Sequence, residues 1–376
     1  MTNDELIQLI AHEAFPCVSI VVPMHNKNPE RQNDHLIVKK AIDAAKTLLK
    51  MKEGENGFDS SILSNKLDDL YHQIDFLHVK QGLGIYASST LARLVHFPFH
   101  VHQKIAVNNK FAGMDLYYYL YSTRNYRVLH LQQHAVHLFN GKEDQLNEIM
   151  DGYFPAEYKE EYEYEKAEKI TSHGSTVLKQ FERDKHALQE IRIKDFYKKI
   201  DTSVRNYVAE DMPLLIAGTK NELSSFLEIS KNIQYVKGKV VGDLLFKDHY
   251  ELGRKCWEEL QVQIGKHHDY LINELEEDFG RNLLVYGVYN VYSAAIDGKG
   301  RLLLVDKEYK NAELIYPDGI AVNNGKKRSK DKDHILMSDA FETVIRLVRD
   351  KGGEIVFVEP QKLNEWKGIA LQLRYQ

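Results

Sequence analysis

The segment from Thr171 to Thr176 combines the residue types that an exposed, ligand-contacting loop uses. It reads Thr171-Ser172-His173-Gly174-Ser175-Thr176, and a helix with a basic face is predicted after it, over residues 177–208. Hydroxyl and imidazole groups beside a glycine let a loop tip approach a phosphate backbone closely, and cations behind the tip add attraction. The pattern indicates an exposed loop tip that leads into a cationic helix packed on a core strand, and a local cationic face of this kind can meet phosphates. The alternative is an ordinary polar loop in front of a surface helix.

Several elements must position this tip. The predicted helix has apolar residues at near-helical spacing: Leu178, Phe181, Leu188, Ile191, Phe196, Ile200 and Val204. A buried strand follows at residues 213–218, and two paired strands are predicted upstream, at residues 127–131 and 135–139. These elements indicate a core on which the basic helix packs.

Strands and helices alternate in the remaining chain. Near the N-terminus, Thr2 and Glu5 form a capping-box pattern for a first helix. A strand is predicted at residues 17–23 and a helix at residues 33–49. A long helical pattern begins near residue 247. A strand, a helix and a second strand then follow over residues 285–305, and an apolar strand ends the chain with Leu373-Arg374-Tyr375.

Taken in order, these segments resemble the archaeo-eukaryotic class-1 release factors. That family has a His-Gly start leading into a Gly-Gly-Gln tip, then a basic helix and an apolar strand ending in Ala-Gly, as Ala217-Gly218 does here. Its third domain characteristically finishes in Leu-Arg-Tyr. The N-terminal third resembles the bacterial branch of the superfamily, and the chain as a whole most resembles the Balon family of ribosome hibernation factors. It departs from the release factors in one respect, because Gly-Gly-Gln is absent.

The resemblance implies an α/β fold of three α/β domains. These are an N-terminal α/β domain over residues 1–112, an RNase H-like middle domain over residues 113–240, and a C-terminal α/β/α sandwich over residues 241–376. The first domain is expected to face the ribosomal decoding centre, the middle tip the peptidyl-transferase centre, and the third domain a translational GTPase. We expect the last sheet to carry helices on both faces.

The residues expected to contact ribosomal RNA lie in two places. The first is the polar loop after the N-terminal strand, and the second is the middle-domain tip with the cations behind it. The full set is His25, Asn26, Lys27, Asn28, Arg31, His173, Gly174, Ser175, Thr176, Lys179, Arg183 and Lys185. Plain solvent exposure of both loops is the alternative.

The function implied is that of a hibernation factor that binds the A site of the 70S ribosome as a tRNA and release-factor mimic. It would block translation and shield both catalytic centres without peptide hydrolysis, as a non-enzymatic monomer without cofactor, with elongation factor Tu as partner. The alternatives are a Pelota-like rescue factor, or a peptidyl-tRNA or RNA hydrolase acting on stalled ribosomes. An RNA-binding adaptor that never enters a ribosome is a third class.

Length, net charge and cysteine content limit the classes of protein to which the chain can belong. The chain has 376 residues, a formal net charge of −5 and two cysteines, Cys17 and Cys256. This length allows several domains, and so few cysteines suit a reducing cytoplasm. No apolar run reaches the length of a membrane span, and the acidic N-terminus lacks a secretory signal. The net charge does not indicate a general RNA coat, so RNA contact requires a locally cationic face.

Histidine clusters raise the question of a metal. The clusters are His96, His100 and His102; His130, His134 and His137; and His267 with His268. Their spacing completes no recognisable zinc set, so no metal site is predicted, and packing or RNA contact is expected instead. A nuclease built from carboxylates that are distant in the sequence stays open as an alternative, because the sequence does not show which of them converge.

Overall fold

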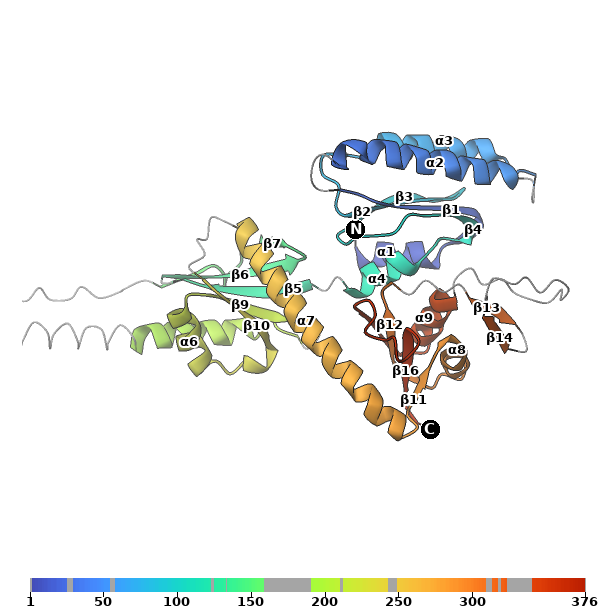
Figure 1. The fold of residues 1–376 in the computed structure, drawn as a ribbon. Helices are drawn as coiled ribbons and strands as arrows, with labels where there is room; N and C mark the ends of the chain where they lie inside the picture. The colour runs from blue at the N-terminus through green and yellow to red at the C-terminus, as the bar shows by residue number, and fades with distance from the viewer. Residues whose placement is uncertain are drawn as a thin grey trace, which may run out of the picture. The chain divides into compact units, whose positions relative to one another are not determined.

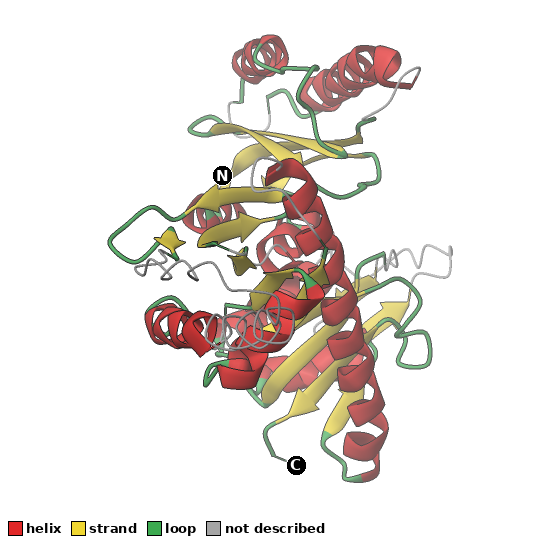
Figure 2. Cartoon of the chain, turned by 90° about the vertical axis from the view of Figure 1, so that its left-hand side faces the viewer, coloured by secondary structure: helices red, strands yellow, loops and turns green. Residues whose placement is uncertain are grey.

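Helices and strands are interleaved along the whole chain in a mixed α/β fold, as expected (Figures 1 and 2). The computed structural model describes eleven stretches of the chain. They are residues 2–25, 30–54, 58–122, 125–132, 134–158, 191–209, 212–242, 249–308, 313–316, 319–322 and 340–375. The predicted tip at residues 171–176 and residues 26–29 beside His25 therefore lie outside the described residues.

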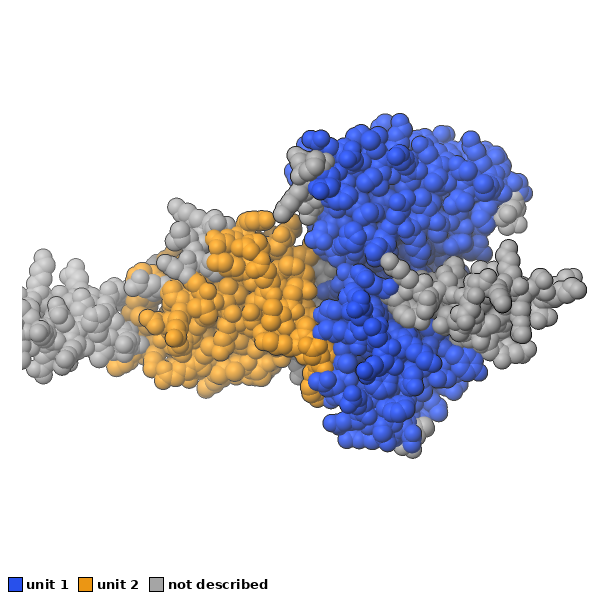
Figure 3. All heavy atoms as spheres, in the orientation of Figure 1, with its two compact units in different colours: residues 1–122, 272–376 blue, residues 123–271 orange. Residues whose placement is uncertain are grey.

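The chain forms two compact units (Figure 3). Unit 1 combines residues 1–122 with residues 272–376, and unit 2 comprises residues 123–271. The three domain ranges expected from the sequence stay a prediction. Among the described residues, unit 1 contains two four-stranded sheets and a two-stranded hairpin, and unit 2 contains one larger sheet.

The N-terminal sheet of unit 1 has the strand order β3-β2-β1-β4, with every pair antiparallel. Its strands are β1 (Glu13–Pro23), β2 (Gly82–Ala87), β3 (Ala92–Phe97) and β4 (Lys104–Lys110). β1 is central and buried on both faces, because Val18, Ile20 and Val22 point to one core while Cys17 and Val21 point to another. The predicted strand at residues 17–23 is thereby confirmed.

Helices cover both faces of this sheet (Figure 1). On one face lie α2 (Asp34–Met51) and α3 (Ser60–His72), and on the other lie α1 (Asn3–Ala11) and α4 (Met114–Ser122). The apolar residues of α2 recur at helical spacing, which puts them in one core cluster. The capping box predicted from Thr2 and Glu5 is formed at the start of α1.

The C-terminal sheet of unit 1 has the order β11-β16-β12-β15. Its strands are β11 (Leu284–Tyr286), β12 (Gly300–Asp306), β15 (Glu354–Val358) and β16 (Ile369–Leu373). The helices α8 (Val288–Ile296) and α9 (Ala340–Asp350) share one apolar core with it. A hairpin of β13 (Glu313–Tyr316) and β14 (Gly319–Val322) stands apart from this sheet. The predicted strand-helix-strand opening and the terminal strand are confirmed, with β16 in the interior of the sheet.

The two sheets of unit 1 are joined through α4. Tyr117 belongs to the same core cluster as α8 and α9, and the ring of Tyr118 meets Phe357 of β15 edge-on at 5.5 Å. The carboxylate of Glu342 on α9 accepts hydrogen bonds from the backbone N–H groups of Gly113 (2.7 Å) and Met114 (2.9 Å). The ammonium of Lys307 lies 4.4 Å from the centre of the Tyr118 ring. The N-terminal and C-terminal segments of unit 1 thus share one core.

The sheet of unit 2 has the order β10-β9-β5-β6-β7, with β8 (Ala156–Glu157) paired to β6. The other strands are β5 (Asn125–Leu131), β6 (Ala135–Lys142), β7 (Gln145–Glu148), β9 (Leu214–Gly218) and β10 (Val236–Val241). β5, β6 and β7 are antiparallel neighbours, whereas β9 and β10 run parallel to β5. This is the strand arrangement of ribonuclease H-like domains, as expected for the middle domain.

Helices pack on both faces of this sheet as well. One core cluster contains residues from the helical segment 191–204 and from α6 (Lys220–Ile229). The other contains residues from α7 (His249–Gly280). The predicted hairpin is confirmed, with His130 opposite His137 in the antiparallel register.

The basic helix differs from its prediction in two details. It ends at residue 204 rather than 208, because Asn206 and Tyr207 form tight turn hydrogen bonds and the Tyr207 hydroxyl donates to Asp151. Ile191 was expected on the apolar face but is 56% exposed. In the first described turns of the helix, Ile193 and Tyr197 contact the core instead.

Candidate nucleic-acid interface

Two of the predicted RNA-contacting residues, His25 and Arg31, lie in the described part of the chain. The structure leaves the others outside the described residues: Asn26, Lys27, Asn28, His173, Gly174, Ser175, Thr176, Lys179, Arg183 and Lys185. Two separate regions are therefore described below: the surroundings of His25 and Arg31 in unit 1, and the described end of the basic helix in unit 2.

His25 is fixed to the first turn of α2. Its backbone N–H donates to Oδ2 of Asp34 at 2.9 Å, and its ring Nδ1 lies 2.7 Å from Oδ1 of the same carboxylate. A carboxylate only accepts, so Nδ1 carries the proton in this pair. Asp34 is buried at the N-terminal end of α2, where the helix dipole favours negative charge, while the imidazole stays partly exposed. The contact fixes where the loop at residues 25–31 begins.

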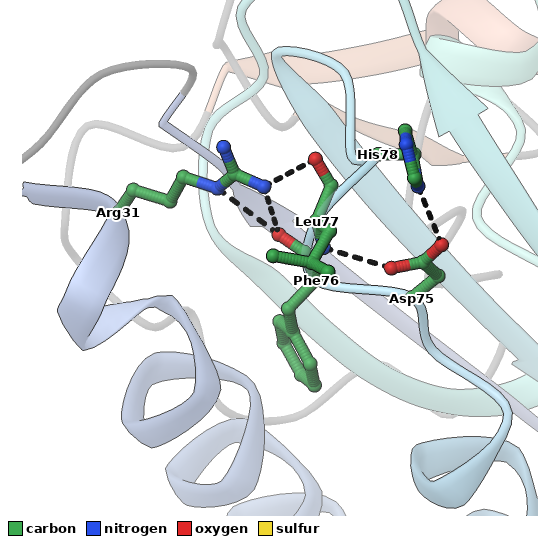
Figure 4. Close-up of polar contacts among 5 residues, drawn as sticks. All are labelled: Arg31, Asp75, Phe76, Leu77 and His78. Atoms are coloured by element: carbon green, nitrogen blue, oxygen red, sulfur yellow. Dashed lines mark hydrogen bonds and ion pairs between the residues drawn. The ribbon is translucent and has the colours of Figure 1, made fainter.

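Arg31 fixes where that loop ends. It lies in a short 3-10 turn, Glu30–Asn33, and its guanidinium reaches the segment between α3 and β2. Nε and Nη2 donate to the carbonyl oxygen of Phe76 at 3.1 and 2.9 Å, and Nη2 also donates to the carbonyl oxygen of Leu77 (Figure 4). The planar fork suits two neighbouring acceptors. Arg31 therefore braces a second loop, residues 74–80, against the first.

The 74–80 loop has its own internal hydrogen bonds. Oδ1 of Asp75 accepts from the backbone N–H of Leu77 at 2.9 Å, and Oδ2 lies 2.7 Å from the ring Nδ1 of His78 (Figure 4). The hydrogen bond from His78 holds the pKa of the Asp75 carboxyl below its usual value, and the backbone N–H of Leu77 adds to this effect. Phe76 and Val79 pack against the core below.

The basic side chains of Lys80 and His96 lie near one another beside β3. Burial lowers the pKa of His96 on β3, and the nearby ammonium of Lys80 lowers it further. Lys80 belongs to the 74–80 loop, and Arg31 contacts the carbonyls of Phe76 and Leu77 in it.

At the described end of the basic helix, part of the positive charge is paired within unit 2. Lys194 lies 2.9 Å from Glu228 of α6, and Lys198 lies 2.8 Å from Asp195 one turn earlier. Exposed pairs of this kind contribute about 0.2–1 kcal/mol each, so they would not prevent these lysines from moving to a phosphate. They do reduce the charge that this end presents.

The base of the basic helix is anchored by a buried polar network. Asp201 accepts from the hydroxyl of Ser230 at 2.5 Å, from the backbone N–H of Lys231 at 2.8 Å and from Nδ2 of Asn232 at 3.1 Å. Asp201, Ser230 and Asn232 are all buried. Because a fully satisfied buried network fixes its members, the helical segment 191–204 is held firmly to the end of α6.

Histidines in the described residues are used in packing and hydrogen bonding. The buried His137 lies 2.8 Å from Glu148, and the rings of His100 and His102 meet edge-on at 5.5 Å. Among the residues that the structure describes, no three His, Cys, Asp or Glu side chains are arranged to hold a metal ion. None of the described helices has the length and hydrophobicity to span a lipid bilayer.

Sequence reasoning missed the 74–80 loop. The link from Arg31 to Phe76 spans 45 residues of sequence, and nothing in either segment indicates the other. The local sequence offers one signal for a loop. Polar and apolar residues, Asp75, Leu77 and His78 among them, alternate between a helix and the glycine that begins β2.

The chain is similar to known proteins of one kind. Residues 125–299 match the model of bacterial archaeo-eukaryotic release factor family 3. Among solved structures, the archaeal translation termination factor aRF1 is 13% identical, with 100% of this chain and 99% of that chain covered and a TM-score of 0.26. An archaeal Pelota from a ribosome-bound complex with ABCE1 is 13% identical, covering 100% and 94%, with a TM-score of 0.42.

A third solved structure is Dom34 of S. cerevisiae, a translation termination-like factor involved in RNA quality control that interacts with Hbs1. It is 11% identical, covering 78% of this chain and 81% of that chain, with a TM-score of 0.40. No curated protein matches the sequence. At these TM-scores the whole-chain superpositions carry no argument, so the similarity to release factors rests on the family match of residues 125–299.

Proposed function

Because residues 125–299 match the model of bacterial archaeo-eukaryotic release factor family 3, we propose that this chain is a ribosome hibernation factor. It binds the A site of the 70S ribosome as a mimic of tRNA and release factor. There it blocks translation and shields the decoding and peptidyl-transferase centres. It performs no chemistry and needs no cofactor.

One observation carries this proposal. The segment matching the family contains the ribonuclease H-like sheet, yet the sequence lacks Gly-Gly-Gln and has Ser175-Thr176 in place of the two glycines. The family's glutamine positions water against the peptidyl-tRNA ester, and its two glycines let the backbone approach the ester. Serine and threonine lack the conformational freedom of glycine, so both capabilities are lost. A family member without that tip can occupy the site but is not equipped to release the peptide.

The physical basis of inhibition is steric. A protein held in the A site by many phosphate and protein contacts excludes tRNA without a catalytic residue. The 74–80 loop, held by Arg31 and by Asp75, supports this proposal, because it presents the exposed side chains of Leu77 and His78 on a fixed backbone. Elongation factor Tu is the partner that we propose for the C-terminal segment, and the cytoplasm is where the complex forms.

The test uses purified full-length protein and vacant 70S ribosomes. The protein should sediment with the ribosomes, lower the rate of translation in a reconstituted system and leave peptidyl-tRNA intact. Binding should weaken steeply between low and high salt, since phosphate contacts release counterions. Failure to sediment with ribosomes, while an unrelated A-site ligand still does, would reject the proposal.

The second candidate is ribosome rescue, by a Pelota-like route or by hydrolysis of peptidyl-tRNA or RNA. It is favoured by the His173-Gly174 start of the tip, which matches the family's active members. Peptide release from stalled ribosomes, lost in His173→Ala or Ser175→Ala, would establish this candidate instead. A Leu36→Ala variant, changed on the outer face of α2, is the control.

A further inference from the structure

The 74–80 loop presents an apolar side chain to solvent at a place where its neighbours are buried. Ile74, Phe76 and Val79 contact the core of α2, α3 and the N-terminal sheet, and the Phe76 ring meets Tyr71 edge-on at 5.9 Å. Leu77, in the middle of these anchors, is 74% exposed. The anchors fix the loop, so Leu77 is held outward rather than free to fold back.

His78 stands beside Leu77 and is equally accessible. Its side chain is 81% exposed, while Nδ1 is held by Asp75. The ring is therefore oriented, and in the described part of the chain Nε2 makes no hydrogen bond. An oriented imidazole with one open nitrogen can stack on a flat ligand or exchange a hydrogen bond with its edge.

The charges around the pair are suited to an anion. The Arg31 guanidinium contacts the carbonyls of Phe76 and Leu77, and Lys80 belongs to the same loop. The Asp75 carboxylate is engaged by Leu77 and His78, and Asp34 is buried under His25. Glu30 is the exposed carboxylate of the neighbouring turn. Cations thus border an apolar and imidazole tip.

We propose that Leu77 and His78 form a contact for an unpaired RNA base, with Arg31 as the positioning residue of the loop. Single-stranded RNA offers a matching ligand, since a splayed base stacks on an imidazole such as that of His78 and buries the apolar Leu77 side chain beside it. The inference rests on the proposed function in so far as the base belongs to ribosomal RNA. It adds two contact residues outside the loop at residues 25–31.

The loop is pre-organised for this role. Its backbone is fixed by the Arg31 fork, the Asp75 carboxylate, the buried Ile74 and the partly buried Phe76 and Val79 before any ligand arrives. Binding then orders few additional groups, so most of the contact free energy appears as affinity. Arg31→Lys keeps the charge but removes the fork, which separates positioning from simple electrostatic attraction.

The closing experiment compares full-length wild-type protein with Leu77→Ala, His78→Ala and Arg31→Lys in two assays. The controls are Ile62→Ala, an exposed apolar residue of α3, and His35→Ala, an exposed histidine of α2. The first assay titrates an unstructured single-stranded RNA oligonucleotide. We expect Leu77→Ala and His78→Ala to weaken binding by about tenfold each, from the usual contribution of a stacked base, and the controls to match wild type.

The second assay maps chemical protection of ribosomal RNA bases on 70S ribosomes with the same proteins. We expect Leu77→Ala to lose protection of one base or a few adjacent bases while other protections persist. If the oligonucleotide binds wild type and Leu77→Ala equally, or does not bind wild type, the inference is overturned whatever the ribosome assay gives. If the variants lose ribosome binding with unchanged base protection, the loop contacts a ribosomal protein and the RNA assignment is wrong. If wild type binds the oligonucleotide through Leu77 but not ribosomes, the proposed function fails and the RNA site stands.

Discussion

Glu342 caps a helix that lies 228 residues earlier in the sequence, and its removal gives the sharpest stability prediction. The first backbone N–H groups of a helix have no partner within the helix. At the start of α4, Glu342 on α9 accepts from Gly113 and Met114, so one carboxylate satisfies two of these groups. Glu342→Ala removes this cap and the polar link between the two sheets of unit 1.

The expected cost follows from the two lost hydrogen bonds. The Glu342 side chain is 20% exposed, so water can replace part of the interaction, and the cost is that of a strong helix cap, about 2 kcal/mol. For a folded unit of this size, each kcal/mol lowers Tm by about 2–4 °C. We therefore expect the Tm of Glu342→Ala to fall by about 4–8 °C in differential scanning calorimetry.

Two variants serve as controls. Glu342→Gln keeps an acceptor oxygen but loses the charge that strengthens these bonds, so about half of the loss should remain. Glu354→Ala removes an exposed carboxylate at the start of β15 in the same unit and should change the free energy of unfolding by less than about 0.5 kcal/mol. If Glu342→Ala unfolds at the temperature of the wild type, the proposed cap does not stabilise α4.

Three further predictions concern other described contacts. Burial raises the pKa of the Asp115 carboxyl in the folded state above its ordinary value of 3.8, so folding penalises its charged form at neutral pH. Asp115→Asn should therefore raise Tm at pH 7. This gain should shrink as the pH falls to 3.8 and below, which thermal unfolding measured across pH would show. Gly253 of α7 packs so closely on the turn after β6 that an added Cβ would lie 2.0 Å from the carbonyl oxygen of Asp144. Gly253→Ala should therefore lower the free energy of unfolding in urea by about 1–3 kcal/mol, although alanine has the better helix propensity. Gly280→Ala, with open space around it, should not destabilise the protein, and equal effects of the two changes would contradict the packing. Asp201→Ala leaves the buried donors around it without their acceptor, so the free energy of unfolding should fall by about 3 kcal/mol. Amide hydrogen exchange in the helical segment 191–204 should become faster. Unchanged exchange there would refute the anchoring role.

The parts of the fold that the sequence predicts are those fixed by local patterns. The capping box of Thr2 and Glu5 lies within one turn of helix, and the hairpin of β5 and β6 lies within one short stretch. The strand β1 is a continuous apolar run because both of its faces are buried. Each of these features can be read from residues that are close in the sequence.

The site was predicted less completely, since its contacts are long-range. Arg31 was expected to face RNA because of its charge and loop position, but its guanidinium is bound to the carbonyls of Phe76 and Leu77. Which carbonyls it meets depends on the packing of α3 beside α2, and no local pattern encodes that packing. The same is true of Glu342 and Gly113. The expectations for residues 173–185 fall outside the described residues and stay predictions.

The most direct test of the central claim is competition for the A site. Ribosomes carrying peptidyl-tRNA in the P site would be incubated with the full-length protein, and the binding of aminoacyl-tRNA and the integrity of the peptidyl ester would be measured together. The account predicts that the protein excludes aminoacyl-tRNA in proportion to its own occupancy while the peptidyl ester stays intact. Simultaneous binding of the protein and aminoacyl-tRNA, or release of the peptide, would contradict it.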